Sequence, residues 1–195
     1  MKTASRVLGG LQLPIVQAPL SGGASTPELA IAACRAGALG FLAAGYLTAE
    51  KLAEDISRVR RLFTGPFGVN LFVPDEKSPK AVDLPSYIER IRIEASAVGC
   101  EPGEPKWSDD DWQSKLEVVL AERPAVVSFT FGCPAREVIN DLHAAGIEAW
   151  VTVTEPDEAA FATEVGADAL VVRESRQADI VRALSTRMVW ERSDC

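Results

Sequence analysis

The sequence predicts an α/β protein built on a buried parallel sheet. Strand-like apolar runs alternate with helix-like stretches along the chain, and one local pattern recurs three times: a helix ends, a glycine follows and an apolar strand begins. The three copies are residues 36–41, 145–150 and 165–170. Strands that are apolar without alternation are buried on both faces of a sheet. Repeated units of this kind form either a doubly wound sheet or a (β/α) barrel.

Six segments are expected to be strands. Each is short, apolar and bounded by glycine, proline or a helix cap. They cover residues 13–19, 38–42, 67–72, 125–131, 147–153 and 169–172. A closed (β/α)8 barrel needs eight strands and typically about 250 residues. The 195 residues of this chain therefore leave such a barrel about two strands short.

Helices are expected between these strands, and most of them start at a Ser, Thr or acidic residue that suits an N-cap. The segment 154–157 is expected to cap one helix, and Ser108, which precedes three aspartates, is expected to cap another because acids favour a helix N-terminus. Residues 74–82 contain two prolines and several charges, which predicts a loop. Residues 99–108 predict a turn-rich break, and residues 173–195 show no further strand. The expected helices cover about residues 26–36, 48–62, 84–98, 109–121, 134–145 and 154–165.

Composition and charge exclude several classes of function. The chain is 47% apolar and 25% charged, as in ordinary globular proteins, and its net charge is −8. An acidic chain repels nucleic-acid phosphates and anionic membrane surfaces, so neither is an expected partner. No apolar run approaches the ~20 residues of a membrane span, and residues 7–12 are too short for a secretion signal, which predicts a cytoplasmic location. Four cysteines without CxxC spacing and a single histidine argue against a metal site.

Two polar or glycine-rich segments follow predicted strands, where a barrel would place its active site. The first is the loop 17–23, whose Ala18 and glycines let the backbone approach a flat ring. A tight turn that merely requires glycine explains the loop equally well. The second is Asn70, whose amide must find partners if it is buried and has both donors and acceptors for a heterocycle. The alternative is an asparagine that bonds its own loop.

Three further features carry weaker indications. The aromatic side chains of residues 128–132 either wall a cofactor pocket or belong to the core. His143, the only histidine, lies on a predicted helix away from any strand end, so a surface or packing role is expected. Cys133 follows a strand, but no histidine is placed to activate it as a nucleophile.

The order and spacing of several motifs resemble the nitronate monooxygenase (2-nitropropane dioxygenase) family. The resemblance covers about residues 12–172 and rests on residues 14–23, 26–30, 43–46, 68–72, 128–132 and 166–172. It implies a TIM-barrel flavoprotein that binds FMN and oxidises alkyl nitronates with O2 to a carbonyl compound and nitrite. It also implies that Ala18, Pro19 and Leu20 line the flavin ring and that Asn70 contacts the isoalloxazine. The family usually has methionine where Leu20 stands, a swap that conserves volume.

The resemblance stops after Val172. The family continues with Gln-Gly-x-Glu-Ala-Gly-Gly-His-Arg, in which the histidine is the catalytic base, whereas this chain reads Arg-Glu-Ser-Arg-Gln-Ala-Asp-Ile-Val-Arg over residues 173–182. Deleting one base from a codon choice for the family motif reproduces these ten residues in order. We therefore expect a partial FMN-binding TIM-barrel domain over residues 1–172, an out-of-frame tail over residues 173–195, and no catalytic residue in this chain.

Several consequences follow from that expectation. A chain without the histidine, two strands and the phosphate site should bind FMN weakly or not at all, and an unpaired sheet edge favours poor solubility and self-association. Three alternatives remain: a related FMN barrel oxidoreductase of the enoyl-thioester reductase type, a non-catalytic remnant or binding module, and one half of a two-chain barrel.

Overall fold

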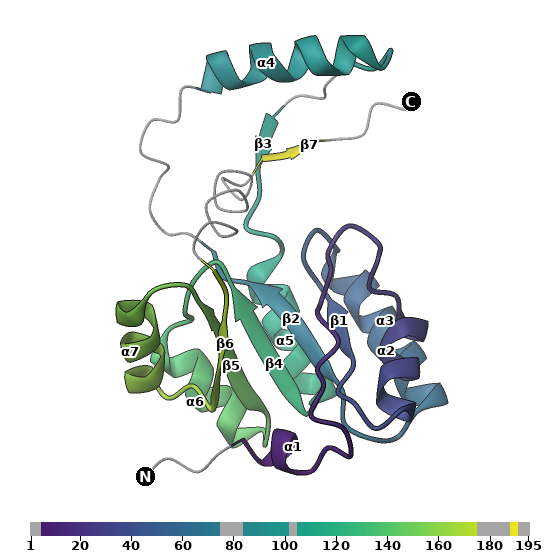
Figure 1. Ribbon diagram of the computed structural model, residues 1–195, viewed down its shortest axis with the longest axis vertical. Coiled ribbons are helices and arrows are strands. Elements are labelled where there is room, and N and C mark those ends of the chain that lie inside the picture. The colour runs from purple at the N-terminus through teal and green to yellow at the C-terminus, as the bar shows by residue number, and fades with distance from the viewer. Residues whose placement is uncertain (1–4, 75–83, 102–104, 175–187, 191–195) are drawn as a thin grey trace.

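The structure, a computed structural model, describes residues 5–74, 84–101, 105–174 and 188–190. Its main sheet has five parallel strands in the order β1-β2-β4-β5-β6. Neighbours in this sheet are also neighbours along the chain, so the strands wind in one direction around an open barrel, as Figure 1 shows. The predicted α/β fold of an incomplete TIM barrel is thereby confirmed over the doubly wound alternative. The strands are β1 (Phe41–Ala43), β2 (Gly68–Phe72), β4 (Val126–Thr130), β5 (Glu148–Val153) and β6 (Ala169–Val172).

Helices cover the outer face of this sheet, while the remaining elements lie at its two ends (Figure 1). The covering helices are α2 (Pro27–Arg35), α3 (Ala49–Leu62), α5 (Trp112–Glu122), α6 (Arg136–Ala144) and α7 (Pro156–Val165). The short α1 (Arg6–Gly9) lies below the strands. Helix α4 (Leu84–Ala97) and the antiparallel pair β3 (Pro105–Trp107) and β7 (Met188–Trp190) lie above them. This pair corrects the expectation of a break without strands at 99–108 and of no strand after residue 173.

The expected first strand, residues 13–19, is reduced to one bridge. Val16 forms an isolated parallel bridge with Leu39. The amide of Gln17 donates to Leu39 O at 2.9 Å, and the amide of Leu39 donates to Ile15 O at 3.0 Å. The segment thus lies beside β1 where the sequence places it. Pro14 and Pro19 carry no amide hydrogen, which interrupts the pairing on both sides of the bridge, although the Leu13 amide still donates to Gly37 O at 2.9 Å.

Two apolar clusters explain why the strands read as apolar without alternation. Because successive side chains of a strand point to opposite faces, alternate residues enter different clusters. The larger cluster packs one face of β1, β2, β4 and β5 against the helices, for example Leu71 and Phe129 against helix α5. The smaller cluster fills the inside of the curved sheet with Leu39, Phe41, Val126 and Trp150.

One of two predicted helix caps, Ser108, is wrong by a few residues. Helix α5 begins at Trp112 after Asp111, a left-handed N-cap residue, whereas the Ser108 hydroxyl accepts a hydrogen bond from the Asp110 amide at 3.0 Å and so closes a turn. Helix α7 is capped within the expected segment, by Glu155 in a capping box with Glu158. The Glu158 side chain accepts from the Glu155 amide at 3.3 Å, whereas Asp111 makes no side-chain capping bond at α5.

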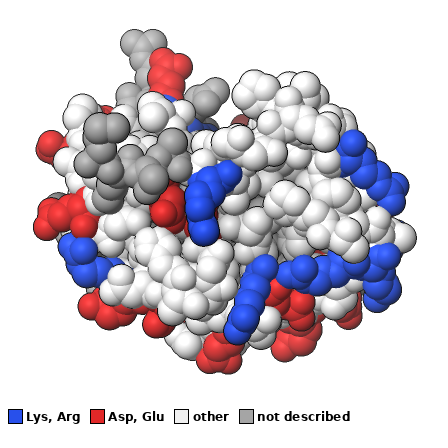
Figure 2. Space-filling model, turned by 90° about the horizontal axis from the view of Figure 1, so that it is seen from below, with Lys and Arg blue, Asp and Glu red and all other residues white. Residues whose placement is uncertain are grey.

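Apolar side chains are exposed at both edges of the sheet, beside β1 and on β6. Ile15 is 56% exposed at one edge, and Val172 is 79% exposed at the other. Figure 2 views the molecule from below, where acidic side chains lie mostly along the left and lower rim and most basic ones towards the right, with one basic and one acidic side chain side by side near the centre. Among the described residues, no helix is long and apolar enough to cross a membrane.

Candidate functional site at the carboxyl ends of the strands

The loop after the first segment is held by two polar side chains. The Gln17 side chain accepts from the Phe41 amide at 2.9 Å through Oε1 and donates through Nε2 to Ser25 Oγ at 3.1 Å. Ser25 Oγ also accepts from the Leu20 amide at 2.7 Å and donates to the carbonyl oxygen of Ala18 at 3.3 Å. These bonds fix the backbone of the loop while the side chains of Ala18 and Leu20 remain exposed and that of Pro19 half-buried. The loop therefore presents a small, apolar and rigid surface.

Asn70 lies inside the curved sheet, 3% exposed, one layer above the apolar interior cluster. Its amide nitrogen donates to strand β4: to Ser128 Oγ at 3.0 Å, to Thr130 Oγ1 at 3.0 Å and to Ser128 O at 3.2 Å. Its Oδ1 atom accepts no hydrogen bond from any residue that the structure describes. The side chain thus bonds a neighbouring strand and not its own loop, and it keeps an acceptor for a ligand.

Aromatic rings from three strand ends pack together beside Asn70. Phe72 contacts Tyr46 edge-on at a centroid distance of 5.4 Å and Phe131 at 4.7 Å. Phe129 is fully buried in the outer core. The segment 128–132 therefore serves both expected purposes, because Phe129 is core and Phe131 forms part of an aromatic wall. Tyr46 and Phe72 lie in segments that carry the family resemblance but were not predicted as site residues, although Tyr46 comes three residues after β1 and Phe72 ends β2.

A small hollow adjoins Phe131 at the same end of the sheet. It is lined by residues that follow β4, β5 and β6, including Thr152, Thr154 and Arg173, and measures about 40 Å³. Cys133 lies nearby, where burial raises the pKa of its thiol to about 11. A thiol with such a pKa is almost entirely protonated at neutral pH, so Cys133 is a poor nucleophile, as the sequence predicts.

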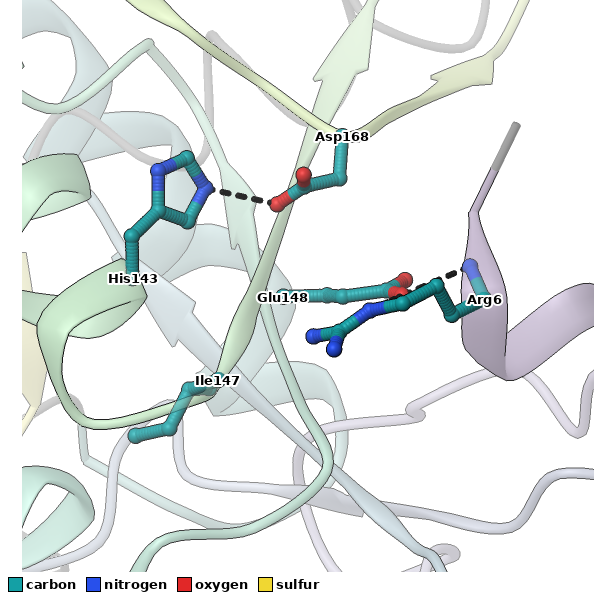
Figure 3. Close-up of a pocket in the computed structure, with 5 residues that line it drawn as sticks. All are labelled: Arg6, His143, Ile147, Glu148 and Asp168. Atoms are coloured by element: carbon teal, nitrogen blue, oxygen red, sulfur yellow. Dashed lines mark hydrogen bonds and ion pairs between the residues drawn. The ribbon is translucent and has the colours of Figure 1, made fainter. Parts of the chain in front are cut away.

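A larger hollow, about 220 Å³, lies at the opposite end of the strands. Figure 3 shows its lining residues paired with one another: His143 Nε2 lies 2.8 Å from Asp168 Oδ2, and the Arg6 amide donates to Glu148. Asp168 Oδ2 also accepts from the Ala149 amide at 2.8 Å, so the His143 contact braces α6 against β5 and β6. Residues at this end of a barrel serve stability and those at the carboxyl ends serve catalysis. The packing role expected for His143 fits this position.

Asp109, Asp110 and Asp111 do not gather around a common centre. Asp110 bonds the Tyr46 amide and pairs with Lys115, whereas Asp109 accepts from the Asp111 amide at 3.1 Å. Within the described ranges, no group of three or more His, Cys, Asp or Glu side chains is arranged to hold a metal ion. Around Asn70 the polar groups are the hydroxyls of Ser128 and Thr130 and a backbone carbonyl, which suit an organic ring better than a cation, whereas Glu158 and Arg173 line the small hollow beside Phe131.

Comparison with known proteins relates this site to one family. Residues 6–177 match the sequence pattern of the family described as "Nitronate monooxygenase". A nitronate monooxygenase of Pseudomonas aeruginosa is 39% identical over 170 residues, which are 84% of this chain and 48% of that protein. A probable nitronate monooxygenase of Bacillus subtilis is 33% identical over 166 residues, 85% of this chain and 47% of that protein. The chain spans about half the length of these relatives.

Solved structures give the same result. The nitroalkane oxidase of Streptomyces ansochromogenes has a TM-score of 0.79 and 45% identity, covering 86% of this chain and 48% of that one. A mutant of FabK from Thermotoga maritima is a more distant neighbour, with a TM-score of 0.62 and 25% identity, covering 87% of this chain and 46% of that one.

Proposed function

Because this chain belongs to the nitronate monooxygenase family, we propose that it supplies the flavin-facing part of an FMN-dependent barrel that oxidises alkyl nitronates with O2 to a carbonyl compound and nitrite. The observation that supports this most directly is the Oδ1 acceptor of buried Asn70, to which no residue that the structure describes donates, at the same end of the sheet as the aromatic wall and the first loop. A cytoplasmic location is part of the same proposal.

The residues present fit the ring of a flavin. Asn70 Oδ1 would accept from a ring NH, since its amide nitrogen is already engaged with Ser128 and Thr130. Ala18, Pro19 and Leu20 would lie against the ring, because their backbone is fixed and their side chains are small or apolar. The flavin supplies the redox chemistry, while the chain binds it, orients it and excludes water from one side.

We further propose that residues 1–172 form the barrel domain and that residues 173–195 are an out-of-frame tail. The agreement of residues 173–182 with a one-base deletion in the family motif supports this. Of this tail, only 173–174 and 188–190 lie among the described residues. Sequencing the DNA across codons 172 and 173 and several hundred bases downstream tests the proposal. A second frame that encodes the missing histidine motif and two more βα units supports it, and the lack of such a frame overturns it.

The activity is tested by comparing two proteins: the 195-residue chain, and the product of the same gene with the base restored after codon 172. We expect nitrite from an alkyl nitronate only with the restored product and FMN. Oxidation of NAD(P)H with an enoyl thioester, without nitrite, would instead indicate the reductase alternative. A restored product that binds no flavin and turns over neither substrate would indicate a non-catalytic protein. Activity that appears only after a separately encoded chain is added would indicate a two-chain barrel.

Replacing Asn70 by leucine in the restored product is expected to weaken FMN binding about tenfold or more, because one hydrogen bond to the ring is lost. Flavin fluorescence titration measures the affinity. Ser128→Ala is the matched control, since it removes one partner of the Asn70 amide without touching the ring face. Leu20→Met, which conserves volume, should leave the affinity within about twofold. Equal FMN affinity in Asn70→Leu and the unaltered restored product would contradict the assignment of Asn70.

Self-association through the exposed sheet edges is also expected. Val172 is 79% exposed on β6, the last strand of the sheet order, and Ile15 is 56% exposed beside β1. Unpaired strands of a sheet edge are ready templates for another chain. Sedimentation velocity over a range of concentrations should show species larger than the monomer, and a strictly monomeric chain that melts cooperatively would refute the expectation.

A further inference from the structure

A buried ion pair lies beneath the turn that follows β1. Lys115 Nζ is 2.8 Å from Asp110 Oδ2, and the two side chains are 1% and 14% exposed. Neither atom makes an aligned hydrogen bond within the described part of the chain, so each charge is balanced by the other. Removing two charges from water is costly, and such pairs are better explained by the arrangement they fix than by the stability they add.

The second carboxylate oxygen of Asp110 bonds the backbone of the turn at Tyr46. Asp110 Oδ1 accepts from the amide of Tyr46 at 2.8 Å. Tyr46 has φ of 66°, in the left-handed region that a bulky side chain rarely adopts, and Asp110 itself has φ of 59°. Burial raises the pKa of Asp110, and the neighbouring Lys115 ammonium and Tyr46 amide act in the opposite direction. The carboxylate thus joins a buried helix residue to a strained turn 64 residues earlier in the chain.

This turn contacts the face proposed for the flavin at two points. The Tyr46 ring packs edge-on against Phe72, which ends the strand that carries Asn70. Gly45 approaches so closely that a Cβ there would overlap the Phe72 ring and lie 2.7 Å from Ser21 Oγ in the first loop. A shift of the turn would therefore be transmitted to both Phe72 and the first loop.

We propose that Asp110, held in place by Lys115, is a positioning residue that locks the turn at Tyr46 and thereby shapes the cofactor face. The functional half of this inference rests on the proposed flavin site. The structural half concerns contacts of this chain alone.

Amide hydrogen exchange of Tyr46 tests the structural half in the unliganded 195-residue chain. Asp110→Ala should speed this exchange about tenfold or more relative to core amides of α3, because the acceptor is lost. Asp110→Asn combined with Lys115→Met keeps a carbonyl acceptor without burying a charge, and it should retain the slow exchange. Unchanged Tyr46 exchange in Asp110→Ala would overturn the inference. If Asp110→Ala unfolds as a whole, the double variant decides: fast Tyr46 exchange in that variant overturns the inference.

FMN titration of the same variants tests the functional half. Asp110→Ala should weaken binding about tenfold, and the double variant should stay within about twofold of the unaltered chain. Faster Tyr46 exchange with unchanged FMN affinity would overturn the link to the cofactor face. If only the restored product binds FMN, the same comparison is made in that product. If neither protein binds FMN, the proposed flavin site fails, while the exchange result still decides whether Asp110 locks the turn.

Discussion

Replacing Gly40 by alanine is expected to destabilise the chain by about 3 kcal/mol or more, because the added methyl group would overlap the backbone of a packed helix. Gly40 lies directly before β1, where the chain passes against helix α2. A Cβ there would lie 2.7 Å from the carbonyl carbon and 2.8 Å from the Cα of Ala30, and closer still to its carbonyl oxygen. All three atoms are backbone of a buried helix, so no side-chain rotation relieves the overlap. The amide of Gly40 also donates to Cys34 Sγ at 3.2 Å, and a shift of the strand would break that contact.

Urea unfolding followed by tryptophan emission measures this effect. Gly9→Ala is the matched control, because a Cβ on Gly9 would meet no atom within 4 Å. The control should change the free energy of unfolding by less than ~0.5 kcal/mol. A Gly40→Ala chain that unfolds at the same urea concentration as the unaltered chain would show that α2 and β1 separate easily, contrary to the packing described here.

The order of the sheet could be predicted because its signals are local. Three glycines that end a helix before an apolar strand, Gly37, Gly146 and Gly166, all have positive φ. This conformation costs glycine little, and so the residue marks the start of the next strand. Parallel strands linked by helices then leave few topologies. The same reasoning placed the first loop and Asn70 at one end of the sheet, where the structure has them.

The remaining parts depend on contacts between distant residues. The pairing of β3 with β7 joins residues 81 to 85 positions apart, from Trp107 with Met188 to Pro105 with Trp190, and no local pattern encodes it. Lys115 did leave a signal, because it lies on the buried side of α5 beside Leu116 and Val119. A charged residue on an apolar helix face requires a partner, although its identity as Asp110 follows only from the fold.

Glu148 is also recognisable from sequence, as a carboxylate within an apolar strand. Replacing it by glutamine is expected to lower the free energy of unfolding by about 3–5 kcal/mol. The side chain is buried and accepts four hydrogen bonds: from Ser5 Oγ at 2.5 Å, the amides of Arg6 at 2.7 Å and Val7 at 3.1 Å, and Trp150 Nε1 at 3.1 Å. A glutamine amide can accept at only one of its two ends. Its NH2 group would face donors, and the attachment of α1 below the sheet would be lost.

Arg6→Ala is the control, because the Arg6 side chain is 79% exposed and its Nε lies 3.7 Å from Glu148. Surface ion pairs of this kind contribute little, so the control should lose less than about 1 kcal/mol. Urea midpoints at pH 7 give both values. Equal losses in the two variants would show that the exposed ion pair, and not the four hydrogen bonds, holds α1.

The pH dependence separates the charge of Glu148 from its shape. Burial alone raises the pKa of Glu148, but the hydrogen bonds from Ser5, Trp150, Val7 and Arg6 outweigh it and lower the pKa below its usual value of 4.5. A carboxyl with a depressed folded-state pKa stabilises the fold above its unfolded pKa, and this contribution is lost as the pH falls through the folded value. The free energy of unfolding of the unaltered chain should therefore approach that of Glu148→Gln as the pH falls below about 4.5. A difference between the two that stays constant from pH 7 to pH 3 would mean that Glu148 acts through packing, without its charge.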